Sequence, residues 1–401
     1  MSFTRNQFII LGAIGFIVLV VAIIILSGIG LRPEREKIIL TVWGIDSPAV
    51  FEAAKSGFSV ERPEVQIIYT QFPEEDYEEE LIDALAAGQG PDIFFFRSDW
   101  MHRHRNKIIP APQRLLSVDR FAELFPQVVV QDFVFNNQIY SFPLFIDTLA
   151  LYYNRDIFDR RGVVSPPSTW SGFQSTVARG VVASFGGATP LVVRAGDIMN
   201  ALLMQANASR LQEGEPMQIS GTPGVTALNL YTSVRVPAVE TYTGFANGTI
   251  GMIIDYQSAK PLILARNPHL NFAVAPLPQI HPNVPILPAR YYGLAVSNRA
   301  SSPALAWEFI FYTTTNVQVA RSYLTASGRP PALRSLIQTN IDSPIHGVFA
   351  SQALIARSWN MPASEDVFAI FNTMIQSVLR RTATVHDALA NAERDINALT
   401  R

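Results

Sequence analysis

Four aspartates follow short apolar runs of the sequence, at positions where a strand would end and the chain could meet a ligand. They are Asp46, Asp99, Asp147 and Asp255. A pair of such carboxylates on either side of a sugar ring could hydrolyse a glycosidic bond, and single carboxylates could accept hydrogen bonds from ligand hydroxyl groups. No partner motif accompanies any of the four. Hydroxyl binding or helix capping is therefore favoured over catalysis for each.

Residues for other chemistries are missing or badly placed. The chain contains no cysteine, which excludes thiol catalysis, disulfides and thiolate metal sites, and leaves no cysteine to carry a lipid. It has no phosphate-binding glycine loop and no Gly-x-Ser-x-Gly turn. His102 and His104 alternate with Arg103 and Arg105, whose charges oppose a bound cation. We expect a protein without catalytic residues, cofactor or metal.

The bulk composition predicts a large protein with two cores. The chain has 401 residues, of which 48% are apolar, and more than one ordinary core is expected at this length. Its formal net charge of -2 gives no basic excess to neutralise phosphates. The composition therefore argues against disorder and against binding to nucleic acid.

The N-terminal region contains no charged side chain between Arg5 and Arg32. Its almost wholly apolar part, Phe8–Ile29, is about 22 residues long and would span about 33 Å as a helix, enough to cross a bilayer. We expect a transmembrane helix in residues 1–37. A cleaved signal peptide is the alternative, because small residues lie near the end of the segment. The basic residues that follow it do not favour an exterior globular part, so orientation needs another argument.

The elements that would position the aspartates alternate between strand and helix, the order typical of an open α/β sheet. Strands are expected at 38–43, 65–69 and 93–96, with helices at about 47–58 and from Glu74 to a stop at Gly88. A second α/β unit is expected around strands 251–256 and 272–275. The predicted helix starts in the second half of the chain are Ser168 or Thr169, Asp197 as the cap of a helix through Gln205, Ser302, Ser364 and Thr384.

The residues Phe142–Asp156 read FPLFIDTLALYYNRD and form a recognisable signature. Further motifs occur in a fixed order around it: Trp43-Gly44, Ala87–Asp92, Pro166–Trp170, Tyr291–Ser297 and Gly328–Pro331. This series resembles the family 1 extracellular solute-binding proteins, the maltose-binding-protein-like receptors of ATP-driven importers. The resemblance runs from about Ile38 to Thr400. The chain departs from many members in lacking a lipid-accepting cysteine, and Phe8–Ile29 could serve as the anchor instead.

The resemblance implies a two-lobed periplasmic-binding-protein-like fold of the α/β class, with the ligand held in a cleft between the lobes. One lobe would comprise residues 38–146 plus 293–345, and the other residues 149–288 plus 346–401. Ligand contacts on both lobes would favour the closed state, because a ligand can shift an equilibrium only through differential binding.

Sugars present apolar ring faces beside hydroxyl edges, so aromatic side chains and carboxylates are expected together in such a site. The ligand-binding residues that we predict are Trp43, Asp46, Arg97, Asp99, Trp100, Asp147, Asp255, Tyr256, Tyr291, Arg329 and Trp359. For Trp43, core packing is as good an interpretation as ligand contact. For Arg329, a structural role in the turn is favoured.

Together these arguments predict a membrane-anchored, extracytoplasmic binding protein that captures a small polar solute, a sugar or oligosaccharide, for the permease of an ABC importer. Two alternatives remain open at this point. One is a membrane-anchored cleft enzyme such as a glycosidase, and the other is a ligand-sensing module that acts through a membrane partner.

Overall fold

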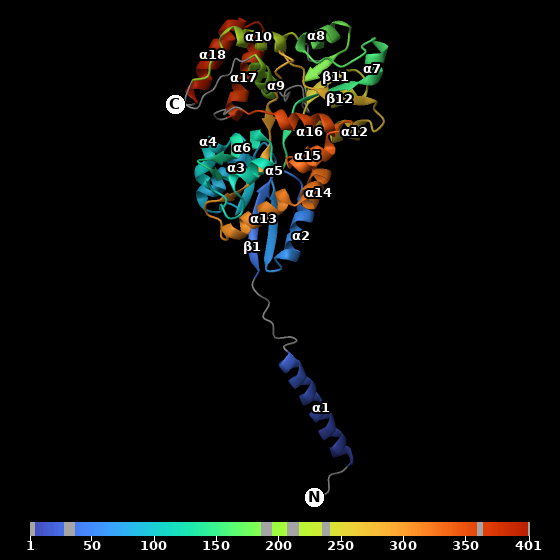
Figure 1. Cartoon of the computed structure of the whole chain (residues 1–401), viewed down its shortest axis with the longest axis vertical. Helices are drawn as coiled ribbons and strands as arrows, with labels where there is room; N and C mark the ends of the chain where they lie inside the picture. Colours follow the sequence, from blue (N-terminus) through green and yellow to red (C-terminus); the bar gives the residue numbers. More distant parts are fainter. Residues whose placement is uncertain are drawn as a thin grey trace.

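The computed structural model describes residues 5–27, 37–185, 195–206, 216–234, 241–358 and 364–399. Two α/β lobes are stacked one above the other, and the N-terminal helix α1 (Arg5–Ser27) stands apart from them (Figure 1). Within the described residues, no helix combines the length and the apolarity needed to cross a membrane. The predicted span Phe8–Ile29 extends at its end beyond the described residues.

Lobe 1 is built on a mixed sheet in which the strands lie in the order β2-β1-β3-β14-β4, with β7 also paired to β14. β1 pairs in parallel with β2 and β3, whereas β14 runs antiparallel to β3, β4 and β7. The strands are β1 (Ile38–Gly44), β2 (Val65–Gln71), β3 (Ile93–Arg97), β4 (Ile108–Ile109), β7 (Phe142–Pro143) and β14 (Tyr292–Ser297). The predicted strands at 38–43, 65–69 and 93–96 are confirmed.

The apolar run of β3 explains its central position, because all five of its residues are buried. Helices cover the sheet, and their bounds are η1 (Pro48–Phe51), α2 (Glu52–Glu61), α3 (Tyr77–Ala87), α4 (Met101–His104), η2 (Arg105–Lys107), α5 (Val118–Leu124), α6 (Gln127–Phe133), α13 (Pro303–Thr315), α14 (Val317–Ser327) and α15 (Arg334–Asn340). Helix α3 ends as predicted at Gly88, whose φ of 74° lies in the left-handed region that suits glycine. A short hairpin of β5 (Val134–Phe135) and β6 (Gln138–Ile139) turns through Asn136 and Asn137, both at positive φ.

Lobe 2 contains a four-stranded sheet in the order β10-β11-β9-β12. Its strands are β9 (Ala150–Asn154), β10 (Ala183–Phe185), β11 (Met252–Asp255) and β12 (Phe272–Pro276). Alternate residues of β9 enter different cores, with Leu151 on one face and Tyr152 on the other. The sheet is therefore covered on both faces, which explains why its strands read as continuous apolar runs.

The helices of lobe 2 are α7 (Arg155–Arg160), α8 (Trp170–Ala178), α9 (Ala195–Gln205), α10 (Thr222–Thr232), α11 (Thr241–Ala246), α12 (Ala259–Arg266), α17 (Ser364–Leu379) and α18 (Val385–Ala398). Two predicted caps are confirmed, since the hydroxyl oxygens of Thr169 and Thr384 accept hydrogen bonds from the backbone N–H groups of Gly172 and Asp387. The predicted cap Asp197 is wrong, because α9 begins two residues earlier and Asp197 lies within its first turn.

Three chain segments lie side by side where the lobes meet. Strand β8 (Asp147–Thr148) pairs antiparallel with β13 (Ala289–Arg290), and Pro288 forms a parallel bridge with Arg357. Helix α16 (His346–Ile355) lies at this boundary (Figure 1) and buries Phe349 in a core of lobe 2 and Ala350 in the core of lobe 1. Residues next to these segments can therefore contact side chains of either lobe.

Candidate functional site

Two small adjoining cavities lie in the cleft between the lobes. Their volumes are about 50 and 40 Å³, and Tyr256 and Arg290 line both of them. Lobe 1 contributes Glu74, Asp99, Phe145 and Tyr292 to their walls, and lobe 2 contributes Asp197, Asn200, Ser258 and Phe368. The cleft is thus lined by carboxylates, aromatic rings and two arginines, Arg290 and Arg329, which both lobes contribute.

Arg97 holds one side of the cleft at the end of β3. Its guanidinium donates to Asp99 Oδ1 at 2.7 Å and to Glu365 Oε1 at 2.6 Å, and it lies 5.3 Å from the centre of the Trp100 ring. Burial would lower the pKa of Arg97, but the Asp99 carboxylate and other neighbours raise it above its ordinary value. Because Glu365 stands in the first turn of α17, this contact joins lobe 1 to lobe 2.

Arg290 occupies the centre of the cleft on β13, at one of the crossings between lobes. Its guanidinium lies 3.5 Å from Asp197, 3.4 Å from Glu365 and 3.7 Å from Glu74. These separations are longer than the short charge-assisted hydrogen bonds of Arg97. Arg290 is therefore stabilised by electrostatic attraction to three carboxylates and not by one short hydrogen bond.

Asp46 and Arg329 form a compact ion pair at the edge of the cleft. Arg329 donates to Asp46 Oδ1 through Nε at 3.2 Å and Nη2 at 2.7 Å, and Tyr323 donates its hydroxyl to Asp46 Oδ2 at 2.5 Å. The Arg329 guanidinium also lies 4.2 Å from the centre of the Phe145 ring. Asp46 is 9% exposed and fully engaged in this network. Arg329 therefore ties the turn after α14 to Asp46 and also lines the cleft, so its role in ligand binding stays a prediction.

The lobe 2 wall is organised around Tyr256 and two aspartates. Tyr256 donates its hydroxyl to Asp197 Oδ1 at 2.9 Å. Asp147 Oδ1 accepts the backbone N–H groups of Thr148 at 3.0 Å and Gln257 at 3.2 Å. Asp147 and Tyr256 thus lie together on the cleft wall, although they are far apart in the sequence.

One buried acceptor in the cleft has no partner among the described residues. It is the side-chain oxygen Oδ1 of Asn200, on α9 beside Asp197. A buried polar atom without a hydrogen bond costs about 1–3 kcal/mol. A ligand hydroxyl or amine that donates to Asn200 would remove this cost.

The buried side chain of Asp132 is bonded to two residues that lie next to the segments joining the lobes, Tyr291 and Ser358. Asp132 on α6 accepts the hydroxyl of Tyr291 at 2.5 Å and also the hydroxyl of Ser358. Burial raises the pKa of Asp132 to about 7, against the opposing effect of these two hydrogen bonds. The side chain therefore keeps its proton at pH values where an ordinary aspartate is ionised.

The structure brings together some of the predicted site residues and buries others. Asp99, Asp147, Tyr256 and Arg329 line the cleft, and Arg97 adjoins it. Trp359 lies outside the described residues. Trp43 is half-buried, with its ring centre 4.5 Å from that of Phe72, which agrees with the packing interpretation.

Three predicted ligand contacts are instead buried within the lobes, because a position at a strand end does not determine which way a side chain faces. Trp100 is 1% exposed and packs among Tyr77, Phe96 and Tyr292. Tyr291 is 0% exposed and bonded to Asp132. Asp255 is 0% exposed and accepts the hydroxyl of Tyr242 at 2.6 Å. In this arrangement none of them presents a surface to a ligand.

Sequence reasoning missed Arg290, Glu365 and Asn200 as cleft residues. Arg290 immediately precedes the predicted contact Tyr291, and Glu365 lies in the first turn of the predicted helix from Ser364. Both could have been found by asking which charged residues flank a predicted crossing between lobes. Nothing in the sequence around Asn200 distinguishes it from an ordinary helical residue.

Three kinds of comparison with known proteins all match binding proteins. A family model described as bacterial extracellular solute-binding protein matches residues 49–346. The chain is 23% identical over 245 residues to a Brucella abortus protein named as a binding protein, covering 57% of this chain and 59% of that protein. It is 22% identical over 351 residues to the maltotriose-binding protein of Pyrococcus abyssi, covering 80% of this chain and 72% of the relative. Its fold is similar to that of the sugar-binding protein MalE of Xanthomonas citri, with a TM-score of 0.77, 17% identity and coverage of 90% and 97%.

Proposed function

This chain belongs to the bacterial extracellular solute-binding protein family, and from that premise we propose that its interlobe cleft captures a sugar or oligosaccharide outside the cytoplasm and delivers it to the permease of an ABC-type importer. The observation that carries the proposal is the orphaned acceptor Asn200 Oδ1 in a cleft lined from both lobes. A donor from the ligand would satisfy this atom, and hydroxyl groups are the donors that a sugar supplies in number.

The charges of the cleft support a neutral, hydroxyl-rich ligand. Arg97 and Arg329 are each bonded to a carboxylate at 2.7 Å, so an anionic ligand beside them would add a second negative charge close to that carboxylate. Hydroxyl groups can instead donate to carboxylates and accept from guanidinium groups without removing either partner. The aromatic rings of Phe145, Tyr256 and Phe368 offer apolar surface beside these polar atoms.

The relatives support the same ligand class. The maltotriose-binding name of the Pyrococcus abyssi relative and the sugar-binding name of the Xanthomonas citri protein both point to carbohydrate. Delivery to an ABC permease is proposed from the family, and co-purification of the chain with a permease complex from its native membrane would test it.

The cleft also supports a closure mechanism. The proposed boundaries are residues 38–146 plus 293–345 for one lobe and 149–288 plus 346–401 for the other, with strands β8 and β13 at two of the crossings. The contact between Arg97 and Glu365 spans the lobes in this arrangement. A ligand bound between them would favour the closed state in proportion to its contacts with both lobes.

Ligand binding is tested by following the melting temperature of the full-length chain, purified in a mild detergent, against neutral sugars, maltooligosaccharides, amino acids and polyamines. A ligand at 100 times its dissociation constant adds about 2.7 kcal/mol of stability. Asn200→Ala should lower the affinity of the active sugar about 3- to 10-fold, since one hydrogen bond is lost. Asn229→Ala is the matched control, because Asn229 is an exposed asparagine on helix α10.

A sugar that stabilises the wild type and loses affinity only in Asn200→Ala supports the proposal. Stabilisation by amino acids or polyamines, with none by any sugar, would overturn the carbohydrate assignment. An equal response of both variants would place the ligand elsewhere. Turnover of chromogenic glycosides by the same preparation would favour the alternative of a cleft glycosidase.

We further propose that the N-terminal segment attaches the protein to the membrane with the lobes on the outside. This rests on the uncharged stretch between Arg5 and Arg32 and on the exposed apolar side chains of α1 such as Phe16, which is 67% exposed. The chain should then sediment with membranes after a carbonate wash, and protease added to intact cells without an outer membrane, or to spheroplasts, should digest the lobes. Release of the chain by the wash, or protection from protease, would contradict the attachment or the orientation.

A further inference from the structure

A larger cavity adjoins the cleft, between α12 of lobe 2 and helices α14, α15 and α16. Its volume is about 390 Å³, several times that of either cleft cavity. Arg329 lines both this cavity and the cleft. Helix α12 also links the two, because Ser258, directly before it, lines the cleft, whereas Lys260 and Pro261 within it line the cavity. A solute in the cleft that extends past Arg329 would therefore enter this cavity.

The cleft cavities are small for a whole solute. Their volumes of about 50 and 40 Å³ are well below the roughly 300–1,000 Å³ of typical small-molecule sites, whereas the cavity beyond Arg329 lies within that range. Helix α12 packs on lobe 2 and helix α14 packs on lobe 1, so this cavity, like the cleft, has walls from both lobes. Closure of the lobes would therefore shape both spaces around one solute.

The walls of the cavity are largely aliphatic. The apolar side chains that form them are Pro261, Leu264, Leu324, Pro331 and Leu336. No aromatic ring lies among the described residues that line the cavity. The cleft, in contrast, offers the rings of Phe145, Tyr256 and Phe368. Because sugar rings pack well on aromatic rings, the aliphatic walls suit an apolar group without hydroxyls better than they suit a further sugar.

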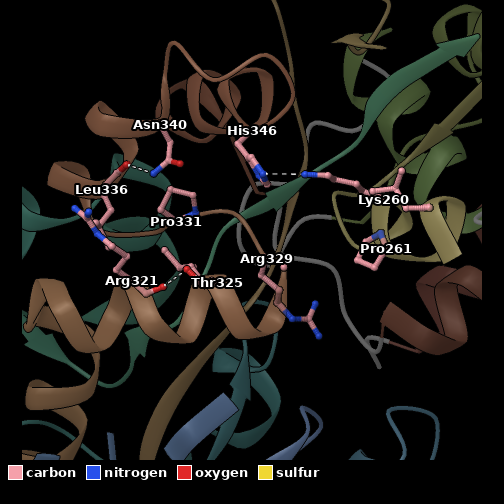
Figure 2. A pocket seen from close by; sticks show the side chains of 12 residues that line it. Lys260, Pro261, Arg321, Thr325, Arg329, Pro331, Leu336, Asn340 and His346 are labelled. Atoms are coloured by element: carbon pink, nitrogen blue, oxygen red, sulfur yellow. Dashed lines mark hydrogen bonds between the residues drawn. The ribbon is translucent and has the colours of Figure 1, made fainter. Parts of the chain in front are cut away.

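The basic side chains around the cavity are turned away from its interior or already bonded. Figure 2 shows the guanidinium of Arg321 pointing away from Lys260 and His346, which lie on the opposite side. The Lys260 ammonium nitrogen contacts His346 Nε2 at 3.1 Å. Arg329 is bonded to Asp46 at 2.7 Å. An uncharged, apolar group therefore fits this cavity better than an ion does.

We propose, on the basis of the sugar binding proposed for the cleft, that the solute is a glycoside with an apolar aglycone. Its sugar occupies the cleft and its aglycone occupies the cavity, so that the glycosidic bond lies beside Arg329. An apolar cavity of about 150 Å³ is large enough to hold benzene. The volume of about 390 Å³ therefore leaves room for an aglycone of one or two rings. Each apolar carbon that is removed from water there adds to the affinity.

The proposal is tested by isothermal titration calorimetry on the full-length chain in lipid nanodiscs. Nanodiscs replace detergent because a detergent with a sugar head group and an apolar tail could itself bind. The probes are the methyl and phenyl glycosides of D-glucose, D-galactose and maltose, in both anomeric forms. At least one phenyl glycoside should bind about ten-fold or more tightly than its methyl counterpart, since the phenyl group buries several more apolar carbons. Phenol and empty nanodiscs are the controls for binding without the sugar and without the protein.

A substitution that fills the cavity tests where the aglycone lies. Thr325 lines the cavity from an exposed position on α14. Thr325→Trp should abolish the preference for the phenyl glycoside and leave the affinity for the methyl glycoside unchanged. Thr373→Trp is the matched control, because Thr373 is also an exposed helical threonine whose hydroxyl bonds to the carbonyl oxygen four residues earlier. Thr373 is not among the residues that line the cavity.

Loss of the phenyl preference in Thr325→Trp but not in Thr373→Trp would support the proposal. Equal affinities of the wild type for methyl and phenyl glycosides would overturn it and leave sugar capture in the cleft intact. A phenyl preference that survives in Thr325→Trp would place the aglycone outside this cavity and would also overturn it. Binding of none of these glycosides would overturn both this proposal and the function proposed for the cleft.

Discussion

Replacing Asp132 with asparagine should remove a pH dependence from the stability of this protein. Asp132 is 5% exposed, and its pKa is raised from 3.8 to about 7 by burial. Between these two values the folded protein retains a proton that the unfolded chain has released. Stability therefore falls as pH rises from about 4 to about 7, and this contribution levels off above that range. Asparagine mimics the protonated side chain, with one acceptor and one donor in place of a charge.

The magnitude follows from the size of the shift. A rise from 3.8 to about 7 corresponds to about 4 kcal/mol, since each pKa unit equals about 1.4 kcal/mol. Roughly 3 kcal/mol of this falls between pH 5 and pH 8. The tyrosine and serine hydroxyls that donate to Asp132 can rotate to suit an amide oxygen and nitrogen. The variant should therefore retain most of the packing around Tyr291 and Ser358.

The assay is urea unfolding of wild type and Asp132→Asn at several pH values from 5 to 8. The stability of the variant relative to wild type should rise by roughly 3 kcal/mol across that interval. Asp395→Asn removes an aspartate whose side chain is 53% exposed and serves as the control. A stability difference that stays constant with pH would show that Asp132 is ionised in the folded protein and would refute the reasoning.

Three further substitutions test other parts of the structure. Glu365→Gln removes the negative charge that contacts both Arg97 and Arg290. It should shift the equilibrium between closed and open lobes toward the open state by about 1 kcal/mol, which small-angle scattering would detect as a larger radius of gyration. The expected shift is small because the Glu365 side chain is 57% exposed. Asp92→Ala deletes a side chain that accepts four hydrogen bonds and should cost about 3 kcal/mol in urea unfolding. Gly224→Ala would place a Cβ 1.7 Å from the carbonyl oxygen of Ile219 and should cost at least about 2 kcal/mol, whereas Gly221→Ala, with its nearest contact at 3.7 Å, should not.

Several elements of both lobes were predictable because their signals are local. The run Ile93–Phe96 is apolar throughout and becomes a buried strand, and Gly88 ends a helix where only a left-handed residue fits. Thr169 and Thr384 could be recognised as caps from their own side chains and the residues that follow them. Each of these features depends on a few consecutive residues, so no knowledge of the partner elements was needed.

The partners of the cleft residues could not be predicted, because they are distant in sequence. Asp46 was named as a ligand contact, yet its partner Arg329 is 283 residues away and occupies it. Trp100 and Tyr291 lie at strand ends, next to Asp99 and Arg290 in the sequence. Yet Trp100 and Tyr291 face the core, whereas Asp99 and Arg290 face the cleft. Neighbouring positions at a strand end differ in orientation, and only the packed structure determines which of them is exposed to a ligand.

The charge pairs of the cleft favour a neutral ligand over an anion. In the cleft, Arg97, Arg290 and Arg329 each lie beside a carboxylate, so an anion would bring a second negative charge close to that carboxylate. A neutral sugar avoids this cost because its hydroxyl groups can donate to one partner and accept from the other.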